Sequence, residues 1–286
     1  MILVTGATGH LGSAVIDNLL RTVPAGQIAA LVRNEAKAAP LKEKGVNIRI
    51  GHYDDAASIQ QAVQGVDSVL LISGLDAHRL QQHITVIDAA RQAGVKHIAY
   101  TSVSFKDVDS SVIKDFMSGH FKTEDHIKAS GLNYTIFRNT LYIDALPNFV
   151  GKQVFENGIF LPAGEGKTPF ALRSEMAEAI ANSLLLDSKE KKTYNLTASA
   201  AYSFAEIAAT LSELSGKTIS YTSPDVDTFK QLLKDHGVPE IGILIAAGFA
   251  SDIRNNQYDV VYNDLETLLD RKPTGLKDAL KIFYNL

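Results

Sequence analysis

A glycine-rich segment near the start of the chain has the spacing of a dinucleotide phosphate site. It reads Gly-Ala-Thr-Gly-His-Leu-Gly and stands between the apolar residues 2–5 and a segment with helical spacing. At such a turn, backbone N–H groups and the positive end of the helix dipole can hold a pyrophosphate. The alternative is an ordinary glycine-rich turn between a strand and a helix. The predicted cofactor-binding residues of this segment are Gly6, Thr8, Gly9, His10, Leu11 and Gly12.

The second apolar run ends in a cation rather than in an acid. In NAD sites an acidic side chain at this place, about 20 residues after the glycines, binds the ribose hydroxyls. Here the run is followed by Arg33, and a guanidinium suits the geometry of a 2′-phosphate. The sequence therefore predicts NADPH as the cofactor, with weaker binding of NADH. The alternative is that Arg33 points to solvent.

Polar side chains also follow the third, fourth and fifth apolar runs. Asp54 can accept from an adenine amino group, although either Asp54 or Asp55 could instead cap the next helix. Ser73 and Gly74 end the fourth run, at the carboxyl edge of the expected sheet, where cofactors bind. Asp54, Ser73 and Gly74 are therefore further predicted cofactor residues. Ser102, which ends the fifth run, could bond a substrate oxygen or cap a helix.

The elements that must position these residues alternate between strand and helix. Continuous apolar runs separated by helix-sized segments are typical of a parallel sheet covered on both faces, so the predicted fold is a doubly wound α/β sheet of the Rossmann type. The expected strands are residues 2–5, 28–32, 47–51, 68–72, 97–101 and 133–137. The expected helices between them are residues 12–22, 35–44, 56–64, 81–93 and 122–129.

The pattern loosens after the sixth run, where glycines and prolines separate short apolar pieces. We predict an NAD(P)-binding domain over residues 1–150. Residues 151–286 are predicted as mainly a smaller, interleaved α+β substrate lobe, with a helix at 175–186 and a strand at 193–196 returning to the main sheet. Helices at 204–215 and 226–235 belong to the lobe. The basic cluster from Lys189 to Lys192 is predicted as a solvated loop.

Composition narrows the function class. The 286 residues are 45% hydrophobic and 21% charged, with a net charge of -4, so no basic surface for nucleic acid or anionic membranes is expected. There is no Cys, and the histidines lack metal-ligand spacing, so we expect no metal. The longest apolar run, residues 241–250, is too short to span a bilayer, and the first residues do not resemble a secretion signal. These features predict a cytoplasmic monomer or homodimer acting on a small molecule.

Several segments together resemble the NmrA-like branch of the atypical short-chain dehydrogenases. These are the glycine turn, the Arg33-Asn34 pair, the Tyr-Thr-Ser end of the fifth run and the Tyr-Thr-Ile-Phe-Arg-Asn run at residues 134–139. Residues 161–167 and 173–177 extend the likeness over nearly the whole chain. Arg138, Asn139 and Tyr142 follow the sixth strand and are expected to line the cofactor end of the cleft, the alternative being ordinary packing between lobes.

The chain departs from the parent superfamily at the catalytic helix. Short-chain dehydrogenases usually carry Tyr-x-x-x-Lys there, and the matching positions hold Phe116 and His120. Reduction of a carbonyl to an alcohol needs a proton for a strongly basic alkoxide, whereas a reduced quinone is a weaker, resonance-stabilised base. The loss of the pair therefore favours quinones, dyes or similar electrophiles. His120 and Tyr142 are the candidate catalytic residues; His120 could instead only anchor its helix.

Two functions remain open on these grounds. The first is a flavin-free NADPH-dependent oxidoreductase that passes hydride directly to a quinone-like or dye-like electron acceptor. The second is a dinucleotide-binding redox sensor of the NmrA-like kind, without turnover. A nucleotide-sugar epimerase is disfavoured by Phe116. Turnover of NADPH with a panel of acceptors would separate the first two.

Overall fold

The computed structural model describes residues 1–151, 153–186 and 190–286, so part of the predicted loop at Lys189 to Lys192 lies outside the described residues. The chain forms two compact units. Unit 1 comprises residues 1–103, 118–139 and 174–194, and unit 2 comprises residues 104–117, 140–173 and 195–286. Each unit takes three separate stretches of chain.

Unit 1 is built on a seven-stranded sheet with the order β3-β2-β1-β4-β5-β6-β9. The pairs β1 with β2, β1 with β4, β2 with β3, β4 with β5, and β5 with β6 are all parallel. The order reverses beside β1, so the ends of β1 and β4 border a crevice where such folds bind ligands. The strands are β1 (Ile2–Val4), β2 (Ile28–Val32), β3 (Asn47–Ile50), β4 (Ser68–Leu71), β5 (His97–Val103), β6 (Asn133–Asn139) and β9 (Lys192–Leu196).

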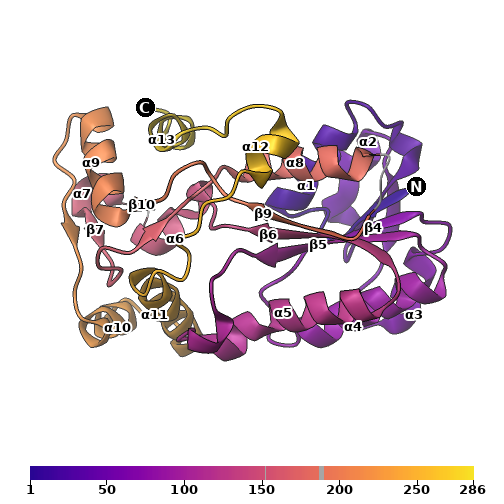
Figure 1. The fold of residues 1–286 in the computed structure, drawn as a ribbon, viewed down its shortest axis with the longest axis horizontal. Helices are drawn as coiled ribbons and strands as arrows, with labels where there is room; N and C mark the ends of the chain where they lie inside the picture. Colours follow the sequence, from indigo (N-terminus) through magenta and orange to yellow (C-terminus); the bar gives the residue numbers. More distant parts are fainter. Residues whose placement is uncertain (152, 187–189) are drawn as a thin grey trace. The chain divides into compact units, whose positions relative to one another are not determined.

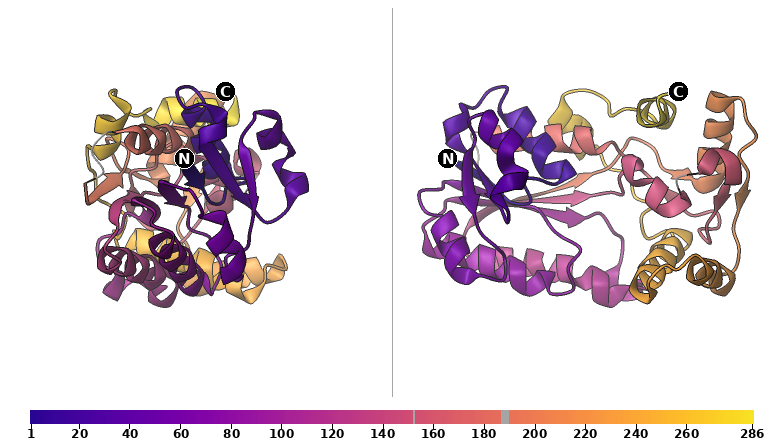
Figure 2. Two further views of the ribbon diagram at one scale, coloured as in Figure 1. Left: turned by 90° about the vertical axis from the view of Figure 1, so that its right-hand side faces the viewer. Right: turned by 180° about the vertical axis from the view of Figure 1, so that it is seen from behind.

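Helices cover both faces of this sheet, which explains why its central strands are buried along their whole length (Figures 1 and 2). One face carries α1 (His10–Leu19), α2 (Ala39–Glu43) and α8 (Arg173–Leu185); the other carries α3 (Ala56–Ala62), α4 (Arg79–Gln92) and α5 (Lys114–Ala129). Short 3-10 turns occur at η1 (Ala25–Gln27), η2 (Glu35–Ala38) and η3 (Val108–Ser110). The doubly wound α/β fold predicted from the alternating pattern is confirmed.

One core cluster of unit 1 lies between the sheet and the helices of the second face. Leu3, Ile59, Ile87, Ile98 and Ile127 are each almost completely buried in one cluster. Burying a side chain of this size contributes about 1.5–3 kcal/mol to folding. The strand ends that carry polar residues are therefore held on a rigid frame.

Unit 2 combines short strands with helices packed through aromatic rings. Its β10 pairs antiparallel with β8, and its β11 pairs parallel with β7. Phe204 is buried, and its ring lies 5.9 Å from Phe170 and 6.4 Å from Phe149, centroid to centroid. The elements are η4 (Ile143–Ala145), α6 (Pro147–Val150), α7 (Val154–Asn157), β7 (Ile159–Phe160), β8 (Lys167–Thr168), β10 (Tyr202–Ser203), α9 (Phe204–Ser215), β11 (Tyr221–Thr222), α10 (Val226–Asp235), α11 (Glu240–Arg254), α12 (Asp264–Leu269) and α13 (Leu276–Tyr284).

The longest apolar run of the sequence forms α11, which packs against the segment before α5. Gly248 permits this approach, because a Cβ at that position would collide with Ile113. The buried Asp252 carboxylate accepts from the Ser111 hydroxyl at 2.6 Å and from the Val112 N–H at 2.8 Å, which fixes the register of the contact.

Among the described residues, no helix has the length and apolar character needed to cross a bilayer.

Candidate functional site

The glycine turn between β1 and α1 is shaped for close approach of an anion. Gly6 has a φ of +58°, in the left-handed region that favours glycine, and its carbonyl accepts from the Gly9 N–H at 2.9 Å. A Cβ on Gly12 would collide with the Gly6 carbonyl oxygen, so only glycine lets the helix pack this tightly. No side chain caps the N-terminus of α1. The first-turn N–H groups and the dipole of the helix are therefore available to an anion, since no side chain caps them.

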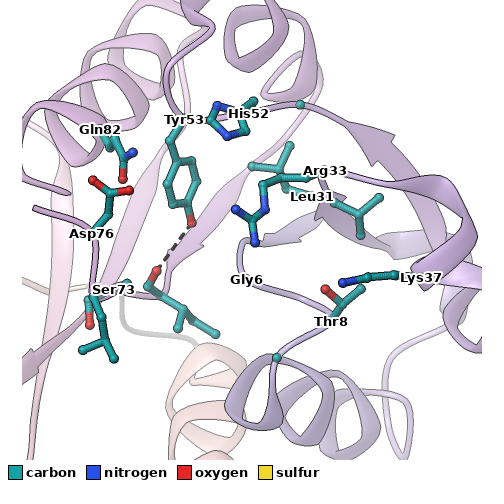
Figure 3. Close-up of a pocket in the computed structure, with 16 residues that line it drawn as sticks. Gly6, Thr8, Leu31, Arg33, Lys37, His52, Tyr53, Ser73, Asp76 and Gln82 are labelled. Atoms are coloured by element: carbon teal, nitrogen blue, oxygen red, sulfur yellow. Dashed lines mark hydrogen bonds between the residues drawn. The ribbon is translucent and has the colours of Figure 1, made fainter. Parts of the chain in front are cut away.

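A cavity of about 630 Å³ lies over this turn, entirely within unit 1 (Figure 3). Six predicted cofactor residues line it, namely Gly6, Thr8, Gly9, Arg33, Ser73 and Gly74. The other predicted cofactor residues do not: His10, Leu11, Gly12, Asp54, Arg138 and Asn139. The lining that the sequence did not predict is Leu31, Val32, Lys37, Gly51, His52, Tyr53, Ile72, Leu75, Asp76 and Gln82.

Two cations share one wall of the cavity. Figure 3 shows both reaching into it, Arg33 from just after β2 and Lys37 from η2. Asn34 accepts from the Ala36 N–H at 2.8 Å and so caps the η2 turn that carries Lys37. Paired cations suit a phosphate dianion better than one cation does, since each supplies charge-assisted N–H donors. The sequence did not predict Lys37, which lies on the 3-10 turn η2 that begins two residues after Arg33.

The opposite wall carries the polar Ser73, Asp76 and Gln82 together with the apolar Ile72 and Leu75. Several of its side chains are fixed by hydrogen bonds. Gln82 lines the cavity and donates its amide to both oxygens of Asp54, at 3.0 and 3.1 Å. Asp55 caps α3 by accepting from two backbone N–H groups, which bears out the capping alternative for that residue. Tyr53 donates a long 3.4 Å bond to the Ile72 carbonyl, the dashed line in Figure 3. Burial raises the pKa of Tyr53 to about 12, so the phenol keeps its proton.

These residues fit a bound NADP molecule. The glycine turn and the start of α1 would hold the pyrophosphate, because Gly6 and Gly9 line the cavity and no side chain caps the helix. Arg33 and Lys37 would hold the 2′-phosphate. A pair of cations rather than a single one would then favour this cofactor over NAD.

His120 lies on α5 and is 9% exposed. Its Nδ1 is 2.9 Å from the hydroxyl oxygen of Tyr100 on β5. Burial is the main cause that holds the pKa of His120 well below its usual value, and the charge of Arg79 and a protonated His83 would lower it further. At neutral pH the imidazole is therefore uncharged, and it offers one N–H donor rather than an acidic proton.

A buried carboxylate on the same helix connects the ends of β5 and β6. The side chain of Glu124 is 1% exposed and accepts from Arg138 through Nε at 2.9 Å and Nη2 at 2.6 Å. Ser102 donates its hydroxyl to the same carboxylate at 2.7 Å, instead of capping a helix. Burial alone would raise the pKa of Glu124, but the bonds from Arg138 and Ser102 and the charges of Arg138 and Lys128 outweigh it and lower the pKa.

The remaining candidates fall in different parts of the chain. Asn139 is buried at the end of β6 in unit 1. Tyr142 belongs to unit 2, where the Arg173 guanidinium lies 4.6 Å from the centre of its ring. Phe116, also in unit 2, meets Phe249 edge to face at 6.3 Å. Within the residues that the structure describes, no group of three or more potential metal ligands is assembled.

Known proteins share this architecture over the full chain. Quinone oxidoreductase 2 of Escherichia coli (strain K12) is 40% identical over 291 residues, covering 100% of this chain and 99% of that protein. Its crystal structure complexed with NADPH superposes with a TM-score of 0.90 at 35% identity, covering 100% of both chains. Triphenylmethane reductase of Citrobacter sp., complexed with NADP(H), gives a TM-score of 0.92 at 38% identity, covering 99% of each chain.

A third relative adds another kind of acceptor. The NAD(P)H azoreductase of Xenophilus azovorans is 31% identical over 242 residues, covering 84% of this chain and 82% of that protein. The family model described as NmrA-like matches residues 1–279. With this match and these full-length relatives, the resemblance seen in the sequence is confirmed, and the chain belongs to the NmrA-like family.

Proposed function

We propose that this protein is an NADPH-dependent oxidoreductase that transfers hydride directly to a quinone-like or dye-like acceptor. The observation that carries the cofactor assignment is the placement of Arg33 and Lys37 together in the wall of the cavity above the glycine turn. The acceptor class is supported by relatives named for quinone, azo and triphenylmethane reduction.

The residues on α5 support the same acceptor class from chemistry. The positions of the Tyr-x-x-x-Lys pair hold Phe116 and His120, so the chain lacks the acid and the cation that carbonyl reduction uses. When bound, the nicotinamide supplies the hydride. A quinone that accepts it becomes a hydroquinone anion, which takes its proton from water. Such a product needs a nearby hydrogen-bond donor but no strong acid.

His120 is the donor that this proposal assigns to the reduced acceptor. A neutral imidazole N–H stabilises a developing oxyanion without giving up its proton, and a fixed donor of this kind contributes about 10²- to 10³-fold to turnover. Because the pKa of His120 is held well below its usual value, its donor capacity does not change around neutral pH. Tyr142, Arg138 and Asn139 are proposed as residues that border the reactive end of the cofactor.

A steady-state assay tests the function. Purified protein is mixed with NADPH and, in turn, menadione, an azo dye and a cationic triphenylmethane dye, and the nicotinamide absorbance is followed. We expect turnover with at least one acceptor and a lower kcat/KM with NADH. Tight NADPH binding by calorimetry without turnover on any acceptor would contradict the proposal and favour a redox sensor.

Reversing the charge at residue 33 tests the cofactor assignment. Arg33→Asp should weaken NADPH binding by about 1.5–3 kcal/mol, roughly ten- to a hundredfold, because it removes a charge-assisted pair and adds a repulsive charge. NADH binding should change little. Dissociation constants for both cofactors, from nicotinamide fluorescence, provide the measurement.

Two further variants sharpen this comparison. Lys37→Ala should show the same preference for harming NADPH, with a smaller effect. Arg21→Asp makes the same charge change at an exposed position outside the cavity lining and should leave both constants unchanged. Equal losses for NADPH and NADH in Arg33→Asp would show that the cation does not discriminate.

Direct transfer also predicts that turnover needs no flavin. We expect the purified protein to lack a flavin absorbance band and to release no fluorescent flavin on acid denaturation. Added FMN should not raise kcat, since the acceptor takes hydride from the nicotinamide itself. Stoichiometric flavin retained through gel filtration, or turnover that depends on added FMN, would refute direct transfer.

A further inference from the structure

Two histidines and a tyrosine meet in a buried cluster in unit 1, where α4 and α5 pack on β5. Tyr100 and His83 are 0% exposed, and their rings meet edge to face at 5.3 Å. His120 contacts the same tyrosine from α5. Arg79, 3% exposed, lies alongside, and Gly119 makes room for it because a Cβ there would come within 3.1 Å of the Arg79 Nε. None of these side chains lines the cofactor cavity.

The proton on His83 can be placed by following the hydrogen bonds. Thr123 donates its hydroxyl to the Gly119 carbonyl at 2.7 Å, and a carbonyl can only accept. The Thr123 oxygen must then accept from its other partner, His83 Nδ1, at 3.0 Å. His83 therefore carries its proton on Nδ1. Its Nε2, which has no partner among the described residues, is left as a bare lone pair.

In the hydrogen bond between Tyr100 and His120, the ring nitrogen of the histidine is the acceptor, whereas in the bond of His83 it is the donor. A phenol, with an ordinary pKa near 10, is a stronger donor than a neutral imidazole, and an imidazole nitrogen is a stronger acceptor than a phenol oxygen. The favoured arrangement of the 2.9 Å contact is thus O–H of Tyr100 donating to Nδ1 of His120. The positive charge of Arg79 lowers the pKa of His120 and so helps to keep its imidazole neutral. A neutral imidazole has one proton, which must then lie on Nε2.

The Nε2–H of His120 is not used inside the cluster. In the described residues, 1–151, 153–186 and 190–286, no hydrogen bond is formed to this nitrogen. His120 is also the one member of the Tyr100, His83 and His120 group with measurable exposure. A donor fixed in direction and without an internal partner is what an incoming oxyanion requires.

We propose that Tyr100 is a positioning residue that locks His120 in the Nε2–H tautomer, so that this N–H is the fixed donor to the reduced acceptor. The inference rests on the proposed function for the role of the donor, but the tautomer itself does not depend on turnover. The bond made by one ring nitrogen sets the proton on the other, so loss of the Tyr100 hydroxyl removes the lock.

Nuclear magnetic resonance on the full chain, with ¹⁵N in its histidines, tests the tautomers without any ligand. Long-range ¹H–¹⁵N correlations distinguish protonated from bare ring nitrogens, and His120→Gln and His83→Gln assign the two signals by their loss. We expect a protonated Nε2 on His120 and a protonated Nδ1 on His83. A protonated Nδ1 on His120 in the unsubstituted protein would overturn the proposal, whatever the activity.

Tyr100→Phe then tests the lock. We expect a mixture of His120 tautomers and a kcat for menadione lowered about 3- to 10-fold, with KM for NADPH unchanged. Tyr258→Phe is the matched control, because it removes a hydroxyl that is equally buried and has no partner among the described residues. It should leave the His120 signals and kcat unchanged. An unaltered His120 tautomer in Tyr100→Phe would overturn the proposal.

The outcomes also separate this inference from the proposed function. If the tautomers are as expected but the protein reduces no acceptor, Tyr100 still fixes the tautomer of His120, and the proposed role of His120 in turnover is refuted. Turnover in a protein with the wrong tautomer would keep the function and refute the lock. If Tyr100→Phe does not fold, the tautomers of the unsubstituted protein still decide the question.

Discussion

Replacing His120 with alanine will lower kcat for quinone reduction by about 10²- to 10³-fold, while NADPH binding stays nearly unchanged. The loss follows from removing one fixed hydrogen-bond donor to an oxyanion. NADPH should be unaffected, because His120 does not line the cavity that carries Arg33 and Lys37. Single-turnover rates and NADPH dissociation constants measured on one preparation provide the test.

A purely structural role for His120 predicts a different result. Alanine would remove the hydrogen bond between the buried Tyr100 hydroxyl and the imidazole and lower the free energy of unfolding by about 1–3 kcal/mol, with kcat of the folded molecules preserved. His126→Ala serves as the control, since that histidine lies on the same helix and pairs with Asp88 at 2.9 Å. A normal kcat in folded His120→Ala would remove this residue from the mechanism.

Glu124→Ala will destabilise unit 1 by about 2–4 kcal/mol. The carboxylate is 1% exposed and accepts three hydrogen bonds at the ends of β5 and β6. Its loss removes the acceptor of two Arg138 donors and of the Ser102 hydroxyl. Urea unfolding at neutral pH measures the loss. Asp125→Asn is the control, because that neighbour is 77% exposed and its ion pair with Lys128 is 3.9 Å long.

The same residue predicts a pH dependence with a definite sign. The pKa of Glu124 is lowered in the folded protein from its ordinary value of 4.5. Its stabilising effect is therefore complete above pH 4.5 and is lost as pH falls through the folded pKa. Glu124→Gln, which keeps the shape but cannot ionise, should flatten this part of the curve of unfolding free energy against pH. An unchanged acid limb would show that Glu124 does not titrate with folding.

Local residue patterns were sufficient to predict the fold and the phosphate turn. Strands buried on both faces are mostly apolar, so the alternation of runs and helical segments indicated a covered parallel sheet before any contact was known. The glycine positions could also be predicted, because Gly6 and Gly12 are required by the geometry of the turn in which they lie. The start of α5 was not: the sequence placed the helix from residue 122, and it begins at Lys114 because packing, not propensity, sustains a turn through Gly119.

Proximity across the sheet was decided by the tertiary structure alone. Gln82 lines the cavity, whereas Asp54, the predicted residue, does not line it and instead accepts from the Gln82 amide. The sequence could name His120 but not its partner. Tyr100 and His120 are 20 residues apart, and Glu124 meets Ser102 and Arg138 from 22 and 14 residues away. Proton positions and pKa values depend on burial and on such neighbours, and these exist only once β5, β6 and α5 have packed together.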